Sequence, residues 1–460
     1  MKQSSPFLLI LFLSSFCFSK TYAQKSAVLE QYIQTGLSNN LALQQQNLDL
    51  RKAQEAIRQS KSLFYPTLQF EANYTRATGG RRIQFPVGDL MNPVFANLNQ
   101  LNELVQPGAP DYPTNIENVN EQFLPDDFHE TKLSFAYPLF NSDLKYNRHI
   151  KEQFFQSKSA QKAAYEHELR YQITEAYLQY LQALEAEKIW QNSKTVLSEL
   201  RRFNESLVKN NVATRDVVAI ADYELSKADN EAYSLTKKQN TARAYFNFLI
   251  NKDLQSEVTV DTALLRSPVA VYQPDALIQN ALANRQEFNA LRAGMNAAET
   301  DVRRNDANLK IPDFYVGGEA GFQGFGYKFN GEQTYALARV GMTYDIFDAG
   351  MRKSKTQEAR LEAEKIRTQF TEVQQQIALQ VTQAWNEFEA ARNSFTTAQT
   401  GLKAAEETFR IVNNKYRASQ ALLIEYLDAQ NRVTTARLQQ LLAWSDVLVK
   451  EAALRKAAGM

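Results

Sequence analysis

Residues 66–75 read PTLQFEANYT, and this short stretch decides which kind of fold the sequence can form. After the proline, the even positions carry Leu68, Phe70, Ala72 and Tyr74, and the odd positions carry polar side chains. Alternation with a period of two predicts a β-strand that has one apolar and one polar face. The preceding segment is rich in Ala, Leu, Gln, Lys and Glu, which is typical of helix. The sequence therefore places a two-faced strand among long helices.

Three further stretches repeat this alternation, at residues 131–140, 313–322 and 334–347, and the first strand is expected to cover 66–76. Each stretch is about ten residues long, which is the length of a tilted strand that crosses a bilayer. Alternation alone is equally compatible with a soluble antiparallel sheet. The export signal described next and the strand length together favour strands that span a membrane.

The first 23 residues have the pattern of a cleaved signal peptide. Lys2 supplies the positive start, residues 6–18 supply an apolar run, and residues 21–23 supply a plausible cleavage site. The one cysteine of the chain, Cys17, lies in this segment, so we expect no disulfide in the mature protein. No later stretch offers the ~20 consecutive apolar residues of a membrane-spanning helix. The sequence therefore predicts an exported protein.

The composition gives no support for nucleic-acid binding or for catalysis. Lys and Arg number 52 and Asp and Glu number 51, so there is no basic excess for a phosphate backbone. Of the three histidines, His149 and His167 share a predicted helix but lie about 27 Å apart, too far for one metal ion. No glycine-rich phosphate loop or nucleophile elbow occurs. We therefore predict no enzyme activity, no cofactor and no metal site.

The chain contains two copies of one unit. YQITEAY at 171–177 corresponds to LQVTQAW at 379–385, an offset of 379 − 171 = 208 residues. Each copy reads as helix, strand, loop, strand, very long helix, tight break and returning helix. We therefore divide the mature chain into a first repeat (24–252), a connecting segment (253–276) and a second repeat (277–460), with breaks at 209–216 and 417–424.

The long helices carry a heptad pattern. The helix expected over 349–416 has apolar residues spaced alternately by three and four, a seam that packs against neighbouring helices. These seam residues are Val381, Ala384, Phe388, Ala391, Phe395, Ala398, Leu402, Ala405, Phe409, Val412 and Tyr416. Such a helix spans on the order of 100 Å. The equivalent helix at 143–208 has a looser seam with a three-residue slip between Ala183 and Ala186.

Four strands do not close a barrel, and an open sheet in lipid leaves unpaired backbone groups at its edges. Several chains must therefore share one barrel if these strands cross a membrane. Two chains would give 2 × 4 = 8 strands with a filled interior, and three would give 3 × 4 = 12 strands with a lumen. The helices that continue the strands would then form a tube of the same symmetry.

These features together resemble the TolC-type outer membrane efflux proteins. The resemblance rests on the duplicated unit, on YPTLQFEANY, on YDIFDAGMRKSKTQEA (344–359) and on NKYRASQALLIEYLDAQNRVTTA (414–436). It implies a homotrimer with a 12-stranded β-barrel in the outer membrane, surrounded by lipid and continued by an α-helical periplasmic tunnel. The implied function is an exit duct of an efflux or type I secretion system, served by an inner-membrane transporter and a periplasmic adaptor.

The resemblance also implies a gate at the helical tips. Glu425 and Asp428 fall on the paired carboxylates of the family, and Tyr416 falls on its gating tyrosine. The two acids are one helical turn apart, so a trimer would bring 3 × 2 = 6 carboxylates around one narrowing and would favour cations. The alternative is that acids near a helix start simply complement its dipole.

The tips also depart from the family pattern. Ser419 stands where the family has glycine, and the gate arginine falls on Ala421, so that Arg417 is the nearby substitute. Asp216 is the expected partner in the other hairpin, although it lies one residue off the internal register. The resemblance implies that the adaptor docks on both tips, at Asn211, Val212, Ala213, Thr214, Ser419, Gln420, Ala421 and Leu422.

The 54 residues from 77 to 130 form a long insertion between the first two strands. With both tips in the periplasm this segment is extracellular, either folded into or over the mouth or present as a mobile surface loop. A protein of a different class stays open as an alternative for the whole chain, namely a periplasmic coiled-coil scaffold without a pore. A stand-alone porin is less favoured because porins need no such helical extension.

Overall fold

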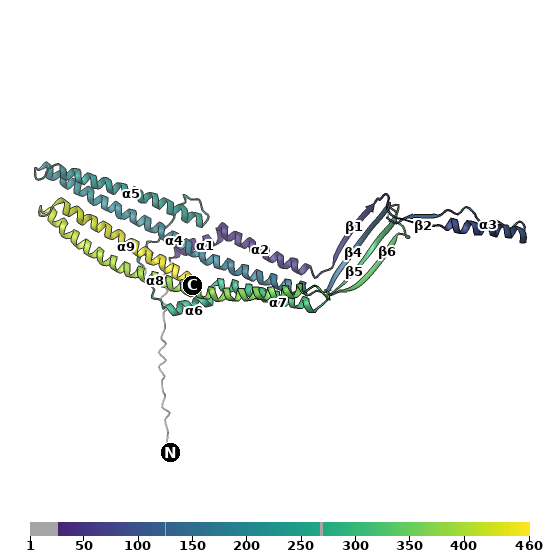
Figure 1. The fold of residues 1–460 in the computed structure, drawn as a ribbon. Coiled ribbons are helices and arrows are strands. Elements are labelled where there is room, and N and C mark those ends of the chain that lie inside the picture. The colour runs from purple at the N-terminus through teal and green to yellow at the C-terminus, as the bar shows by residue number, and fades with distance from the viewer. Residues whose placement is uncertain (1–25, 125, 267–269) are drawn as a thin grey trace, which may run out of the picture. The chain divides into compact units, whose positions relative to one another are not determined.

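The computed structural model describes residues 26–124, 126–266 and 270–460, so the predicted signal peptide (1–23) lies outside the described residues. The chain divides into two compact units. One unit contains Gln153–Asn296, Glu364–Met460 and the chain up to Gln54, and the other contains Glu55–Glu152 and Ala297–Ala363. The first unit is helical, and the second contains the main sheet (Figure 1).

Helices make up most of the described chain. Their bounds are α1 Ala27–Asn39, α2 Leu41–Ser62, α3 Val87–Val105, α4 Ser142–Lys209, α5 Asp216–Leu249, α6 Pro274–Asn284, α7 Gln286–Lys310, α8 Met351–Arg417 and α9 Leu423–Ala457, with a short 3₁₀ helix at Thr262–Arg266. The two longest, α4 and α8, contain 68 and 67 residues and have the extents expected from the heptad pattern. Among the described helices, none is both long enough and apolar enough to span a membrane.

The heptad seam of α8 is the packed side of that helix. All eleven predicted seam positions are buried or half-buried, and Val381 and Phe388 are fully enclosed. Most positions between them are exposed, which agrees with a helix that packs along a single stripe. In α4 the two segments of the looser seam are also buried, from Ile173 to Tyr180 and again at Ala186, Leu197 and Leu200.

Two cores of the helical unit preserve the offset of 208 residues. The first is built on Leu169, Ile173 and Tyr180 of α4, and the second on Ile377, Val381 and Phe388 of α8. The returning helices contribute matched pairs as well, because Phe246 and Ile250 correspond to Leu454 and Ala458. The duplication seen in the sequence is therefore a duplication of packing.

The main sheet has four antiparallel strands in the order β1-β4-β5-β6. Their bounds are β1 Thr67–Thr75, β4 Phe128–Phe140, β5 Asp313–Phe325 and β6 Thr334–Thr343. β4 begins three residues before the expected position and β5 ends three residues after it. β6 stops four residues before the expected end. There the Asp345 carbonyl accepts a hydrogen bond from the Arg352 guanidinium instead of one from the backbone of a neighbouring strand.

The insertion between β1 and β4 is folded rather than a structureless loop. It contains a two-stranded ribbon, β2 Arg82–Phe85 and β3 Val119–Gln122, with helix α3 between the two strands. Figure 1 shows α3 and the ribbon beyond the ends of the four strands. The insertion therefore has secondary structure of its own.

Candidate functional site

The two faces of the main sheet have opposite character. Leu68, Phe70, Val340 and Met342 lie on one face and are 72, 66, 76 and 61% exposed, respectively. The strand register places Leu133 and Phe135 on this same face, since they pair with Phe70 and Leu68. Large apolar side chains at such exposure are costly in water. This face is built to contact an apolar medium.

The opposite face of the sheet carries a charged cluster around Lys132. Its ammonium lies 3.0 Å from the carboxylate of Glu130, 3.2 Å from that of Glu319 and 3.7 Å from that of Glu71. The guanidinium of Arg339 lies 3.7 Å from Glu319. The three acids and two bases of this cluster give it a net charge of −1. The sequence did not single out Lys132, the centre of the cluster, because two of its three carboxylate partners, Glu71 and Glu319, lie on other strands.

The sheet is open at both sides within this chain. In the described residues β1 pairs only with β4, and β6 pairs only with β5. An antiparallel edge strand presents a row of unpaired N–H and C=O groups. A sheet that has an apolar face and two such edges needs strands from other chains before it can enter lipid.

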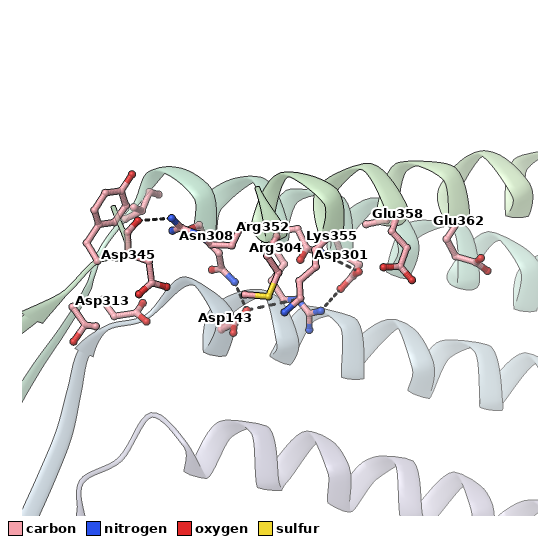
Figure 2. Close-up of a pocket in the computed structure, with 16 residues that line it drawn as sticks. Asp143, Asp301, Arg304, Asn308, Asp313, Asp345, Arg352, Lys355, Glu358 and Glu362 are labelled. Atoms are coloured by element: carbon pink, nitrogen blue, oxygen red, sulfur yellow. Dashed lines mark hydrogen bonds and ion pairs between the residues drawn. The ribbon is translucent and has the colours of Figure 1, made fainter. Parts of the chain in front are cut away.

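A cavity of about 840 Å³ lies where the strands give way to helices (Figure 2). Arg304 from α7 binds Asp301 at 2.7 Å and lies 3.7 Å from Asp143, and Arg352 from α8 binds Asp348 at 2.7 Å. The contact between Arg304 and Asp143 joins α7 to α4, and Arg352, whose guanidinium also donates to the Asn308 carbonyl, joins α8 to α7. No group of three or more His, Cys, Asp or Glu side chains among the described residues is arranged to hold a metal ion. The cavity is therefore a charged joint of the fold.

The two helical tips share one backbone motif. α4 and α8 are each followed by a residue with positive φ, Asn211 at 58° and Ser419 at 58°, which are 208 residues apart. At each tip the next amide donates to a carbonyl five residues back, Val212 to Leu207 and Gln420 to Lys415. This is the Schellman motif that satisfies carbonyls at a helix C-terminus. The break at each tip is thus fixed by helix-capping chemistry.

Tyr416 lies inside the contact between the two hairpins. Its hydroxyl donates a hydrogen bond of 2.8 Å to Oδ1 of Asn204 on α4, and the Asn204 amide donates to the Val217 carbonyl at the start of α5. The Tyr416 ring packs on Phe203 and Tyr426 at centroid distances of 5.9 and 5.2 Å. Loss of water contact raises the pKa of the Tyr416 phenol, and burial raises the pKa of Tyr426 to about 12.

Within the described part of the chain, the side chains of the other expected gate residues form no hydrogen bond with Tyr416. Glu425 accepts a hydrogen bond of 2.9 Å from the Leu422 amide at the start of α9, and Asp428 pairs with Arg432 at 2.7 Å. Both acids are exposed on the same side of α9. Asp216 accepts a hydrogen bond from Thr214 within its own tip, and Arg417 is exposed. The partner of Tyr416 is Asn204, which the sequence did not single out.

The expected docking residues are divided by burial. Asn211, Val212 and Thr214 of the first tip and Ser419, Gln420 and Leu422 of the second are exposed. Ala213 and Ala421, again 208 residues apart, are half-buried, and Ala421 packs against the cluster that contains Tyr416. Val212 and Leu422 are 63 and 67% exposed, so each tip presents one large apolar side chain to solvent.

The chain combines long helical hairpins with a four-stranded, two-faced sheet. The family model of outer membrane efflux proteins matches residues 277–460, the range expected for the second repeat. The chain is 22% identical over 289 residues to the outer membrane efflux protein BepC of Brucella suis biovar 1 (strain 1330). That match covers 63% of this chain and 62% of BepC, so the chain spans less than two thirds of the relative's length.

Solved structures of outer-membrane proteins share this fold. The chain matches the outer-membrane channel OprN with a TM-score of 0.72 at 18% identity, covering 94% of this chain and 90% of OprN. It matches the outer membrane protein VceC of Vibrio cholerae with a TM-score of 0.71 at 15% identity, covering 94 and 96% of the two chains. The expected fold and the resemblance to TolC-type outer membrane efflux proteins are thereby confirmed.

Proposed function

We propose that this protein is an outer-membrane channel that conducts substrate passively from the periplasmic side to the exterior. The observation that carries the proposal is the main sheet, which combines an exposed apolar face, a charged opposite face and two unpaired edges. Three chains would pair these edges into a barrel of 3 × 4 = 12 strands, with the Lys132 cluster lining the lumen. No catalytic step is part of this function.

The long helices support the proposal of a periplasmic tunnel. Helices of 68 and 67 residues reach on the order of 100 Å, far beyond what a porin needs. We assign the tips to the docking of a periplasmic adaptor, which connects the channel to an inner-membrane transporter in an efflux or type I secretion system. The exposed side chains of Val212 and Leu422 are suitable apolar anchors for that contact.

Glu425 and Asp428 are the proposed gate acids at the narrowing of this tunnel. Both are exposed, whereas the adjacent Tyr426 and Leu427 are buried in the contact between the hairpins. In a trimer the two acids would form rings of carboxylates that favour cations. Tyr416 belongs to the same proposed gate as a closing contact, held by Asn204 rather than by Arg417 or Asp216.

The channel function is tested on the full chain extracted from outer membranes. We expect heat-modifiable trimers on semi-native gels and discrete conductance steps in planar bilayers. Recovery of the protein only from the soluble periplasmic fraction would favour a scaffold and exclude the channel.

The gate is tested separately with the double variant Glu425→Ala/Asp428→Ala, which should raise conductance and reduce cation preference. The control is Glu407→Ala on α8, which removes an exposed carboxylate that pairs with Arg410 within the same helix. This control should leave conductance and ion preference unchanged. Conductance and ion preference of the double variant that match the parent protein would exclude Glu425 and Asp428 from the gate.

A further inference from the structure

Helix α3 of the insertion carries an apolar stripe with heptad spacing. The stripe consists of Val87, Met91, Val94, Leu98, Leu101 and Val105, which follow one another at intervals of four, three, four, three and four. This is the spacing that turns apolar side chains to one side of a helix and lets identical helices pack around each other. The stripe was not singled out in the sequence, which left open whether the insertion folds into or over the mouth or forms a mobile surface loop.

The rest of the insertion holds α3 from its other side. Asn92 donates to the Ile116 carbonyl and accepts from the Ile116 amide, both at 2.9 Å. One heptad later, Asn99 makes the same pair of bonds with Tyr112 at 2.8 and 2.7 Å. Gly88 allows this close approach, because a Cβ there would collide with the Ile116 carbonyl oxygen. The helix is therefore fixed in place by the segment that follows it.

The stripe itself is left uncovered by the described part of the chain. Val94, Leu101 and Val105 are 49, 56 and 82% exposed. The neighbouring residues Leu90 and Leu104 widen the apolar surface and are 66 and 81% exposed. Hydrogen bonds hold one side of α3, and its apolar side is exposed to solvent. An exposed apolar surface of this kind is typical of an interaction site.

The charges of α3 favour a second copy of this chain over a lipid surface as the partner. Asp89 and Glu103 are the charged residues of the helix, and at 100° per residue both project away from the stripe. Helices that lie on membranes carry Lys and Arg on their polar face, and α3 contains neither. Identical helices can pack through the uncharged stripe while their acids point outward to water.

The tether of α3 is long enough for copies to meet above one barrel. Twelve strands about 4.8 Å apart and tilted by about 40° give a barrel radius of about 12 Å. Six residues, 76–81, connect β1 to β2 and span at most about 20 Å when extended. Helices from three chains around one mouth can therefore reach the common axis.

We propose that the α3 helices of three copies pack through this stripe into a three-helix bundle over the mouth of the channel. The inference rests on the proposed trimeric channel and adds a contact between subunits outside the barrel and the tunnel. The bundle narrows the exit from above, so the extracellular end has a restriction of its own, separate from the tips.

The experiment uses the full chain with a single engineered cysteine, Leu101→Cys, oxidised in isolated outer membranes. The native Cys17 lies in the predicted signal peptide, so the engineered thiol is the one available for pairing. We expect more than half of the protein to run as a covalent dimer on non-reducing gels, because two of three axial thiols can pair. Glu103→Cys, exposed on the opposite side of α3, is the matched control and should stay almost entirely monomeric.

The outcomes separate this inference from the proposed function. Intact trimers in which Leu101→Cys does not cross-link, or cross-links no better than Glu103→Cys, overturn the bundle and leave the channel standing. Absence of trimers removes both. A polarity-sensitive dye on Leu101→Cys that reports a lipid environment without cross-linking also overturns the bundle, in favour of the membrane surface.

As a second measurement, the double variant Leu101→Asp/Val105→Asp should raise the conductance about twofold while the trimers persist. Unchanged conductance would contradict a restriction at the mouth.

Discussion

The hairpins α4–α5 and α8–α9 have the same backbone at their tips and different side chains where they meet. Asn204 of the first repeat corresponds to Val412 of the second, since 204 + 208 = 412, and Tyr416 corresponds to Val208. The hydrogen bond between Asn204 and Tyr416 therefore has no polar counterpart across the pseudo-symmetry, where two valines stand instead.

The difference between the tips contrasts with the similarity of the middle of the helices. Around Ile173 and Val381 the two cores use apolar residues of similar size at matched positions. At the tips, Tyr426 of the second repeat stands where the first has Val218. The duplication thus preserved the packing that holds the helices together and diverged at the end that we assign to the gate. Four predictions test this contrast.

The largest expected effect is in the shared cores. Phe388→Ala removes a fully buried ring that packs on Tyr272 at 5.6 Å and should lower the free energy of unfolding by about 3–5 kcal/mol. Tyr180→Ala at the matched position of the first repeat should cost a similar amount, because this side chain is 5% exposed. Denaturant unfolding in detergent, followed by circular dichroism, measures both. A loss confined to one repeat would break the equivalence of the cores.

The next effect concerns the polar contact at the tip. Asn204→Val copies the second repeat into the first and leaves the Tyr416 hydroxyl without its acceptor, at a cost of about 1–3 kcal/mol. Adding Tyr416→Phe should restore part of this loss, because both buried polar partners are then gone. The double-mutant cycle should show a coupling of about 0.5–3 kcal/mol. Strictly additive changes would mean that the hydrogen bond does not hold the hairpins together.

Alkaline pH should destabilise the tip of the second repeat through Tyr426. Burial raises the pKa of Tyr426 to about 12, so the folded protein holds this proton more tightly than the unfolded chain, in which tyrosine titrates near pH 10. The corresponding stability is complete below about pH 10 and is lost as the pH rises from 10 towards 12.

The measurement is the unfolding midpoint of the parent protein and of Tyr426→Phe between pH 8 and 12. The variant should lose less stability over this range, while Tyr177 and Tyr272, whose pKa values burial also raises to about 12, supply an equal background in both proteins. Identical pH profiles for the two proteins would contradict the assignment to Tyr426.

The smallest effect is expected from the turn residues. Ser419 adopts φ of 58°, which costs an ordinary side chain about 1 kcal/mol, so Ser419→Gly should stabilise the protein by up to about that amount. Asn211→Gly should gain less, because asparagine tolerates the left-handed conformation better than serine. The unfolding midpoints of the two variants measure these gains. If Asn211→Gly gained as much stability as Ser419→Gly or more, the two tips would differ in more than the side chain at this position.

Much of the architecture was predictable because local patterns encode it. Period-two alternation located the four strands, and the heptads located α8 and its buried seam. The offset of 208 even placed Asn211 over Ser419, which turned out to be the paired capping residues. The end of β6 was predicted wrongly, because the alternation continues through residues 344–347. In the structure the Asp345 carbonyl instead accepts a hydrogen bond from the Arg352 guanidinium, and the strand has already ended.

What the sequence alone determined is the set of elements, since a period of two or of three and four residues is a property of neighbours in the chain. Only the tertiary structure decided that Tyr416 bonds Asn204, which is 212 residues away, and that Lys132 draws together carboxylates from three strands. Such contacts depend on strand register and on the facing of helices. Those are set by the packing of the whole chain, so no local pattern contains them.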